Sequence, residues 1–171
     1  GRLHRRLAAA MPKAVFAALR VREMNPGVNS TAYPLEIGDL GASILRKASI
    51  VFSCVDNEMA RLELSWATNR LNRPLVDGGL GVINPSTGLV SLFPGSGGPC
   101  FACRASTERR RALLTELQGL EAPCSVRERQ QRQEGIMATT PIMASVIGAL
   151  QVEVGLRYVL GAAAAPAPGE G

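Results

Sequence analysis

The chain has 171 residues, a formal net charge of +5, 46% hydrophobic residues and 19% charged residues. This length and hydrophobic content supply one sizeable core but not two full domains, so we expect one domain and a tail. Aromatic residues make up only 4%, and the arginines occur in short clusters. The composition argues against a nucleic-acid stacking surface, and it is compatible with a small anionic ligand such as a nucleotide.

Four cysteines occur in the chain, two of them in the motif Cys100-Phe101-Ala102-Cys103. This usage is typical of a reducing compartment and of a metal site or reactive thiol, not of a disulfide framework. The first residues lead into a short alanine run with no cleavage pattern of a signal peptide. We therefore predict a cytoplasmic protein.

The apolar periodicity predicts alternating helices and strands in the first half of the chain. In order these are a helix from Pro12 to Met24, a short strand at 28–34, a weaker helix at 40–47, a strand at 48–54, a helix at 57–71 and a strand at 74–80. The first helix stops at Asn25-Pro26-Gly27. The apolar face of the helix at 57–71 consists of Ala60, Leu64, Ala67 and Leu71. The near-continuous apolar run at 48–54 is typical of a parallel strand covered on both faces. The succession predicts a βαβ unit.

The second half changes character after Gly78-Gly79. Val82-Ile83 and residues 89–93 flank a turn containing Pro85 and Gly88, which predicts an antiparallel hairpin and hence a mixed sheet. The elements expected next are a glycine-rich loop at 94–99, a polar helix at 107–118, a charged connection at 124–135, and a long apolar helix from Pro141 to about Gly161. Residues 162–171, small residues and prolines apart from one Glu, are predicted to be a disordered tail or linker.

The longest apolar run, residues 140–160, contains Gln151, Glu153 and Arg157. Polar and charged groups at those depths favour a core helix over a membrane span.

Asp56 is the first candidate site residue, because it directly follows the predicted strand at 48–54. In open α/β sheets, ligands bind beyond the carboxyl ends of the strands. Asp56 at this position would alternatively cap the helix that starts near Asn57, and capping and metal contact are compatible. Arg61, one helical turn later, is on its own more typical of a structural or solvent-facing arginine.

An ordered set of short motifs resembles the ThiF/MoeB/HesA family, the adenylate-forming enzymes related to ubiquitin-activating enzymes. The motifs are Pro12-Lys13-Ala14, Asn25-Pro26, Val55-Asp56-Asn57 with Arg61, Pro74-Leu75-Val76, Gly88, Cys100-Phe101-Ala102-Cys103, and Gly148-Ala149-Leu150-Gln151 with Glu153. Each motif is weak alone, but the set covers nearly the whole chain to Gly161. The resemblance implies an α/β, Rossmann-like ATP-binding domain over residues 1–161, with a partly parallel mixed sheet. It also implies ATP-dependent adenylation of the C-terminal carboxylate of a ubiquitin-like or sulfur-carrier protein, and homodimer formation.

The resemblance assigns roles to individual residues. It implies that Lys13 contacts the ATP phosphates, that Asp56 lies by Mg²⁺ and the nucleotide, and that Asn57 and Arg61 belong to the nucleotide site. An arginine that binds phosphate in the family matches Arg2, or in a looser register Arg5. Without the resemblance, Lys13 would be interpreted as a solvated lysine of a first helical turn.

The chain departs from the family pattern at its start. Family members begin with a strand, a glycine-rich turn that cradles ATP and an acid for the ribose, and we expect these elements to precede Gly1. Gly78-Gly79-Leu80-Gly81 does not replace them, because it follows a late strand and precedes a hairpin instead of a helix.

The cysteines suggest two further functions. Cys100 and Cys103 would supply half of a four-ligand zinc site, which family members complete with a second CxxC motif after the last helix. If the natural chain ends at Gly171, the pair is instead expected to be an orphan or to share a metal ion with another chain. Cys124 lies among basic neighbours that favour a thiolate, and the resemblance implies that it accepts the activated carboxyl group as an acyl-sulfur adduct. The alternative for Cys124 is an unreactive surface thiol, and Cys54 is predicted to be a small buried hydrophobic residue.

A non-catalytic dimerisation or protein-docking module of the same fold is the main alternative to the enzyme. A nucleotide-dependent oxidoreductase comes last, because the chain has neither the dinucleotide fingerprint nor a proton-transfer residue. No nucleic-acid or membrane partner is expected.

Overall fold

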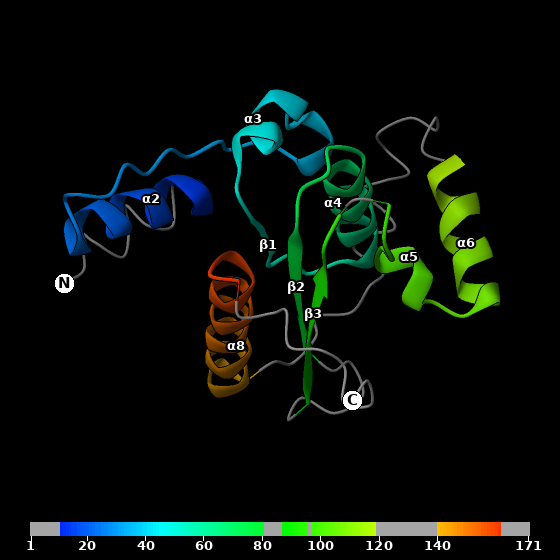
Figure 1. Ribbon diagram of the computed structural model, residues 1–171. Coiled ribbons are helices and arrows are strands. Elements are labelled where there is room, and N and C mark those ends of the chain that lie inside the picture. Colours follow the sequence, from blue (N-terminus) through cyan, green and yellow to red (C-terminus); the bar gives the residue numbers. More distant parts are fainter. Residues whose placement is uncertain (1–10, 81–86, 96, 119–139, 162–171) are drawn as a thin grey trace. The chain divides into compact units, whose positions relative to one another are not determined.

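The computed structural model describes residues 11–80, 87–95, 97–118 and 140–161. The chain divides into two compact units, residues 1–41 and 42–171, and each is described by itself. Figure 1 labels the helices and strands.

The first unit contains helix α2 (Lys13–Met24), which confirms the predicted first helix. The helix ends at Asn25, whose backbone N–H donates to the Val21 carbonyl oxygen at 2.9 Å. A 3-10 helix, η1 (Ile37–Asp39), follows later in the same unit.

The strand predicted at 28–34 is wrong, because these residues form no strand. A strand is stabilised by hydrogen bonds to a neighbouring strand. The described residues of the first unit offer no such neighbour, and the Arg22 guanidinium instead donates to the carbonyl oxygen of Ser30.

The second unit contains a three-stranded mixed sheet with helices around it (Figure 1). Its elements are α3 (Ala42–Lys47), β1 (Val51–Ser53), α4 (Glu58–Arg70), β2 (Leu75–Leu80), β3 (Gly88–Phe93), α5 (Phe101–Arg104), α6 (Thr107–Gln118) and α8 (Pro141–Val159). The strand order is β1-β2-β3, with β1 parallel to β2 and β3 antiparallel to β2. The unit has the architecture of a Rossmann-like α/β fold, as predicted.

Most predicted bounds are close to the observed ones. The helices at 57–71, at 107–118 and from Pro141, and the strands at 74–80 and 89–93, are confirmed to within two residues. The helix predicted at 40–47 begins at Ala42, and the strand predicted at 48–54 is confined to β1. The first strand of the hairpin is β2 itself, whereas Val82-Ile83, the connection at 124–135 and the tail at 162–171 lie outside the described residues.

Helices α4 and α8 cover opposite faces of the sheet. Side chains of successive strand residues point to opposite faces. A Cβ on Gly78 would meet Gln151 of α8 at 2.3 Å, whereas a Cβ on Gly79 would approach Arg61 of α4 at 3.1 Å. The core between these layers includes the fully buried Leu62, Leu75 and Val76.

The buried face of α4 differs from the predicted one. Besides Leu62 and Leu64, the buried residues of the helix are Ser65 and Thr68. Their hydroxyls have partners inside the core: Thr68 Oγ1 donates to the Leu64 carbonyl at 2.8 Å, and Ser65 Oγ accepts from the Phe101 N–H at 2.9 Å. Apolar periodicity alone misses polar residues that are buried because they are hydrogen-bonded.

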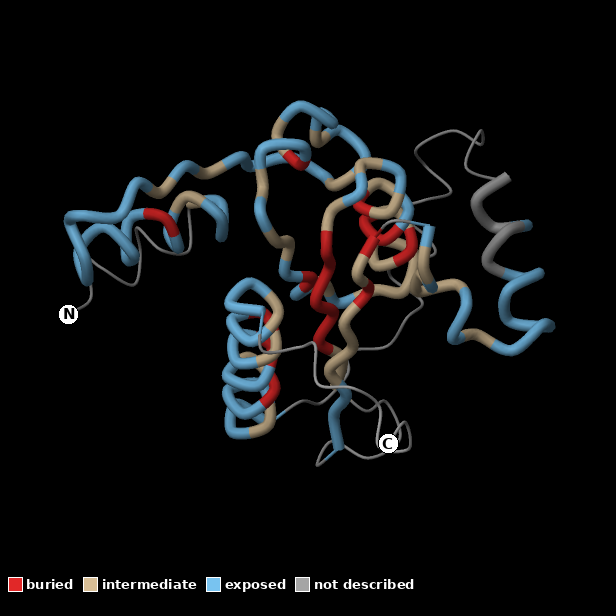
Figure 2. Tube along the Cα trace, in the orientation of Figure 1, coloured by how far each residue is buried: buried red, intermediate tan, exposed pale blue. Residues whose placement is uncertain are grey.

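Helix α8 packs against the sheet along one edge, where Ile147, Gln151 and Gly155 are buried (Figure 2). Its other side chains include large exposed apolar residues: Ile142, Val146, Leu150, Val152, Leu156 and Val159. By length and composition this helix is long and apolar enough to cross a membrane. Only 17% of its most apolar stretch is buried. The predicted homodimer and the predicted cytoplasmic location stay predictions.

Candidate functional site

The candidate site lies where β1 ends and the chain turns into α4. Asp56 is exposed there, and its carboxylate has no hydrogen bond or ion pair to the parts of the chain that the structure describes. Carboxylate oxygens are suitable ligands for Mg²⁺, which is bound through one or two carboxylates plus substrate phosphates. Asp56 therefore fits the predicted metal and nucleotide contact.

Asn57, not Asp56, caps helix α4. The Asn57 side-chain oxygen Oδ1 accepts a hydrogen bond from the Ala60 N–H at 2.7 Å. This bond satisfies one of the unpaired N–H groups of the first helical turn. The alternative role considered for Asp56 is thus filled by its neighbour, and the Asp56 carboxylate remains exposed.

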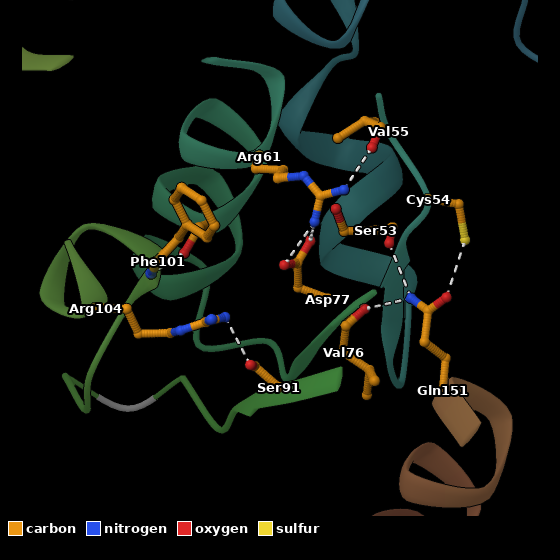
Figure 3. Close-up of polar contacts among 11 residues, drawn as sticks. Ser53, Cys54, Val55, Arg61, Val76, Asp77, Ser91, Phe101, Arg104 and Gln151 are labelled. Carbon is orange, nitrogen blue, oxygen red and sulfur yellow. Dashed lines mark hydrogen bonds and ion pairs between the residues drawn. The ribbon is translucent and has the colours of Figure 1, made fainter. Parts of the chain in front are cut away.

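Arg61 points back from α4 towards the strand ends (Figure 3). Its Nη1 donates to both carboxylate oxygens of Asp77 at 2.9 Å, and its Nη2 donates to the Val55 carbonyl oxygen at 2.8 Å. The side chains of Arg61 and Asp77 are only 16% and 4% exposed. In this structure Arg61 acts within the fold, and its predicted contact with the nucleotide stays a prediction.

Gln151 reaches the same strand ends from α8 on the opposite face (Figure 3). Its amide nitrogen Nε2 donates to the carbonyl oxygens of Ser53 at 2.9 Å and Val76 at 3.3 Å. The Cys54 thiol donates to its Oε1 at 3.7 Å. Cys54 is exposed, so its prediction as a buried hydrophobic residue is wrong: β1 ends at Ser53, and Cys54 is no longer in the sheet.

The remaining nucleotide-site predictions lie elsewhere in the chain. Lys13 is the exposed first residue of α2, in the first unit. Arg2 and Arg5 lie outside the described residues, as does Cys124. The structure therefore brings together Asp56, Asn57 and Arg61, and it leaves the roles of the other residues as predictions.

Cys100 and Cys103 form a close thiol pair around the start of α5. Their sulfur atoms are 3.7 Å apart. Two sulfurs at about 2.3 Å from a zinc ion in tetrahedral geometry would be about 3.8 Å apart, so the pair fits half of a zinc site. Within the described residues no group of three or more metal-binding side chains is found.

The surroundings of Cys103 lower the pKa of its thiol. Hydrogen bonds from the backbone and then the side chain of Cys100 lower the pKa of the Cys103 thiol, and the positive charge of Arg110 acts in the same direction. Partial burial of the thiol raises the pKa by more than the Arg110 charge lowers it, but by less than the hydrogen bonds from Cys100 do. A lower pKa favours the thiolate, which is the form that binds metals.

A hollow of about 330 Å³ opens beside Cys100. It is lined by Trp66, Asn69, Arg70, Gly98 and Cys100. The Asn69 amide donates to the Gly98 carbonyl at 3.2 Å, which joins α4 to the glycine-rich loop in front of the thiol pair.

Comparison with known proteins identifies the family. The ThiF family model matches residues 2–169. The chain belongs to the ThiF family. It is 35% identical over 98 residues to the sulfur carrier protein adenylyltransferase of Thermus thermophilus, an alignment that covers 54% of this chain and 35% of that protein.

Further ThiF-family relatives carry related names. The chain is 32% identical over 102 residues to the adenylyltransferase and sulfurtransferase MOCS3 of Drosophila virilis, which covers 59% of the chain and 22% of the relative. It is 26% identical over 165 residues to the ubiquitin-like modifier-activating enzyme 5 of Bombyx mori, which covers 89% of the chain and 38% of the relative. The chain thus spans between about a fifth and two fifths of the length of these proteins.

Two residues of the site were not found by sequence analysis as site residues. Asp77 sits inside an apolar strand, in Pro74-Leu75-Val76-Asp77, and a lone carboxylate in such a run is a signal for a buried partner. Gln151 stands in an apolar helix, where its sequence context indicates only a polar interruption and a family motif. Both make contacts across 16 or more positions of sequence, which no local pattern predicts.

Proposed function

We propose that the full-length protein adenylates the C-terminal carboxylate of a ubiquitin-like or sulfur-carrier protein, using ATP and Mg²⁺. The observation that carries the proposal is the exposed Asp56 carboxylate just beyond the carboxyl end of β1, without a partner among the described residues of this ThiF-family chain. Relatives of this chain are named as adenylyltransferases and as ubiquitin-like modifier-activating enzymes, which supports the reaction class.

The reaction places clear demands on the residues. A carboxylate oxygen of the carrier tail attacks the α-phosphorus of ATP, the bond from that phosphorus to the bridging oxygen breaks, and pyrophosphate leaves. Bound Mg²⁺ would offset the negative charge that gathers on the leaving oxygens. Asp56 would hold the metal and nucleotide, Lys13 and Arg2 would contact the phosphates, and Asn57 and Arg61 would flank the same site.

A covalent step at Cys124 is the finer part of the proposal. The Cys124 thiolate would attack the acyl carbon of the acyl-adenylate, so that a thioester forms and AMP leaves with the phosphate oxygen. The basic neighbours of Cys124 in Arg127-Glu128-Arg129 support this role through their effect on a thiol.

Zinc is a structural part of the proposal. Cys100 and Cys103 would supply two thiolate ligands, because their 3.7 Å separation matches a shared tetrahedral ion. When bound, the ion would stabilise the fold around α5 without taking part in the chemistry.

The adenylation proposal is tested by ATP–pyrophosphate exchange with the full-length protein. Asp56→Ala is expected to reduce exchange at least about a hundredfold, because the carboxylate that would hold Mg²⁺ beside the reacting phosphates is lost. Cys124→Ser is the matched control: it should keep exchange while losing any adduct that is sensitive to reducing agents.

The outcomes separate the candidate functions. Exchange that survives Asp56→Ala undiminished would remove Asp56 from the mechanism. A folded wild-type protein with no exchange in the presence of its carrier would favour the non-catalytic docking module.

A further inference from the structure

Asp56 follows a short strand but does not belong to it. β1 has three residues, and the chain leaves the sheet after Ser53, three positions before Asp56. Pairing with β2 therefore ends before the candidate ligand is reached. Something other than the sheet has to fix the segment from Ser53 to Asp56.

Two side chains fulfil this task from opposite faces of the sheet (Figure 3). From α4, Arg61 donates to the Val55 carbonyl oxygen at 2.8 Å. From α8, Gln151 donates to the Ser53 carbonyl oxygen at 2.9 Å. Alternate carbonyls of the segment are thus held by α4 and α8, one from each side.

The orientation of the Gln151 amide is fixed by chemistry. Carbonyl oxygens only accept hydrogen bonds, so the NH₂ group has to face Ser53 and Val76, and Oε1 has to face the Cys54 thiol. Gln151 is only 4% exposed, so water does not compete for these bonds. The amide approaches so closely that only a glycine fits at position 78, where a Cβ would lie 2.3 Å from it.

From these contacts we propose that Gln151 is a positioning residue for the nucleotide site: it holds the Ser53–Asp56 segment in place so that the Asp56 carboxylate meets the metal and nucleotide. The inference rests on the proposed adenylation function. Gln151 touches no reacting atom and acts through the backbone that carries Asp56. Residues that orient a metal-binding group in this way typically contribute tenfold to a hundredfold to metal affinity or activity.

Gln151→Met in the full-length protein tests the inference. Methionine keeps the length and volume of the side chain but makes none of the three hydrogen bonds. The expected results are a rise of about tenfold in the KM for Mg·ATP in pyrophosphate exchange, and faster amide hydrogen exchange in a peptide covering residues 53–57. Hydrogen exchange in α6 should not change.

Glu153→Met is the matched control, because it makes the same kind of replacement two residues later on the same helix. Glu153 is exposed and pairs with Arg157 at 2.7 Å, its one ion pair within the described residues, so neither readout should move. Should Gln151→Met unfold the protein as a whole, Gln151→Asn replaces it under the same criteria, since it keeps the amide but withdraws it by one methylene.

The two readouts distinguish a positioning role from a merely structural one. Faster hydrogen exchange at 53–57 with an unchanged KM would overturn the inference, as would no change in either readout. If the wild-type protein shows no pyrophosphate exchange, the adenylation proposal fails, and hydrogen exchange at 53–57 alone decides whether Gln151 orders this segment.

Discussion

At the scale of residues, the interior of the site depends on one buried ion pair. Arg61 and Asp77 are almost enclosed, and the same guanidinium bonds the Val55 carbonyl just before Asp56. Removing one partner of a buried pair leaves the other charge uncompensated in a medium that solvates it poorly. The pair therefore contributes to the position of the site as well as to stability.

Asp77→Ala is expected to lower the free energy of unfolding of the second unit by about 3–5 kcal/mol. Urea denaturation followed by circular dichroism measures the change. Glu153→Ala removes the exposed partner of Arg157, whose side chain is 67% exposed, and should cost no more than about 1 kcal/mol. Equal effects of the two substitutions would contradict the importance of burial.

The residues that sequence analysis found are those whose signal is local. Asp56 and Asn57 stand between a strand pattern and a helix pattern, so their place in the turn followed from the flanking periodicities. The contact between Arg61 and Asp77 could not be predicted in this way, because the parallel strand brings Asp77 next to the first turns of α4 only after folding. The capping role of Asn57 required the observed backbone geometry, since Asp56 and Asn57 are both good capping residues.

At the scale of elements, contact between α8 and the sheet depends on glycines. A Cβ on Gly155 would lie 2.5 Å from the Phe52 ring of β1, closer than two carbon atoms approach. Gly148, on the same helix, has nothing within 4 Å of its would-be Cβ. The two glycines therefore form a natural pair for a test.

Gly155→Ala is expected to destabilise the second unit by about 1–3 kcal/mol, because the methyl group forces the helix away from β1. Gly148→Ala should instead stabilise it, by up to about 1 kcal/mol, since alanine is the better helix former where space is free. Thermal unfolding of the two variants and the wild type measures both signs. A destabilised Gly148→Ala would mean that this side of α8 is covered.

Sequence patterns predicted most helices and the central strands, and they failed where the outcome depends on a distant partner. The apolar periods of α4, α6 and α8 carry their own information, because each helix makes its hydrogen bonds within itself. Residues 28–34 have strand-like composition but no neighbouring strand in the described part of their unit, so composition alone was misleading. The shortening of the strand at 48–54 to β1 has the same origin, since its end is set by the pairing with β2.

At the scale of the whole molecule, the proposed zinc site needs more ligands than the thiol pair supplies. Cys100 and Cys103 supply two of the four ligands that a structural zinc ion takes. A hollow bordered by Trp66 and Arg70 opens beside Cys100. Zinc binding is therefore expected of the full-length protein, and not of the α5 segment alone.

The full-length protein is expected to carry about one zinc ion per chain, measured by elemental mass spectrometry after dialysis. Cys100→Ser and Cys103→Ser should each reduce the zinc content to near zero. Cys54→Ser is the control, since Cys54 bonds Gln151 and belongs to another part of the unit, and it should leave the zinc content unchanged. Metal-free wild-type protein that is otherwise folded would refute the zinc site.

The narrow edge by which α8 meets the sheet has a genetic consequence. Its buried residues Ile147, Gln151 and Gly155 recur every fourth position, and most of the residues between them are exposed. Tolerance to random substitution along this helix should therefore rise and fall with the same period. Loss-of-function substitutions should be most frequent at Ile147, Gln151 and Gly155. These positions follow Asp56, whose surroundings they affect, by almost a hundred residues.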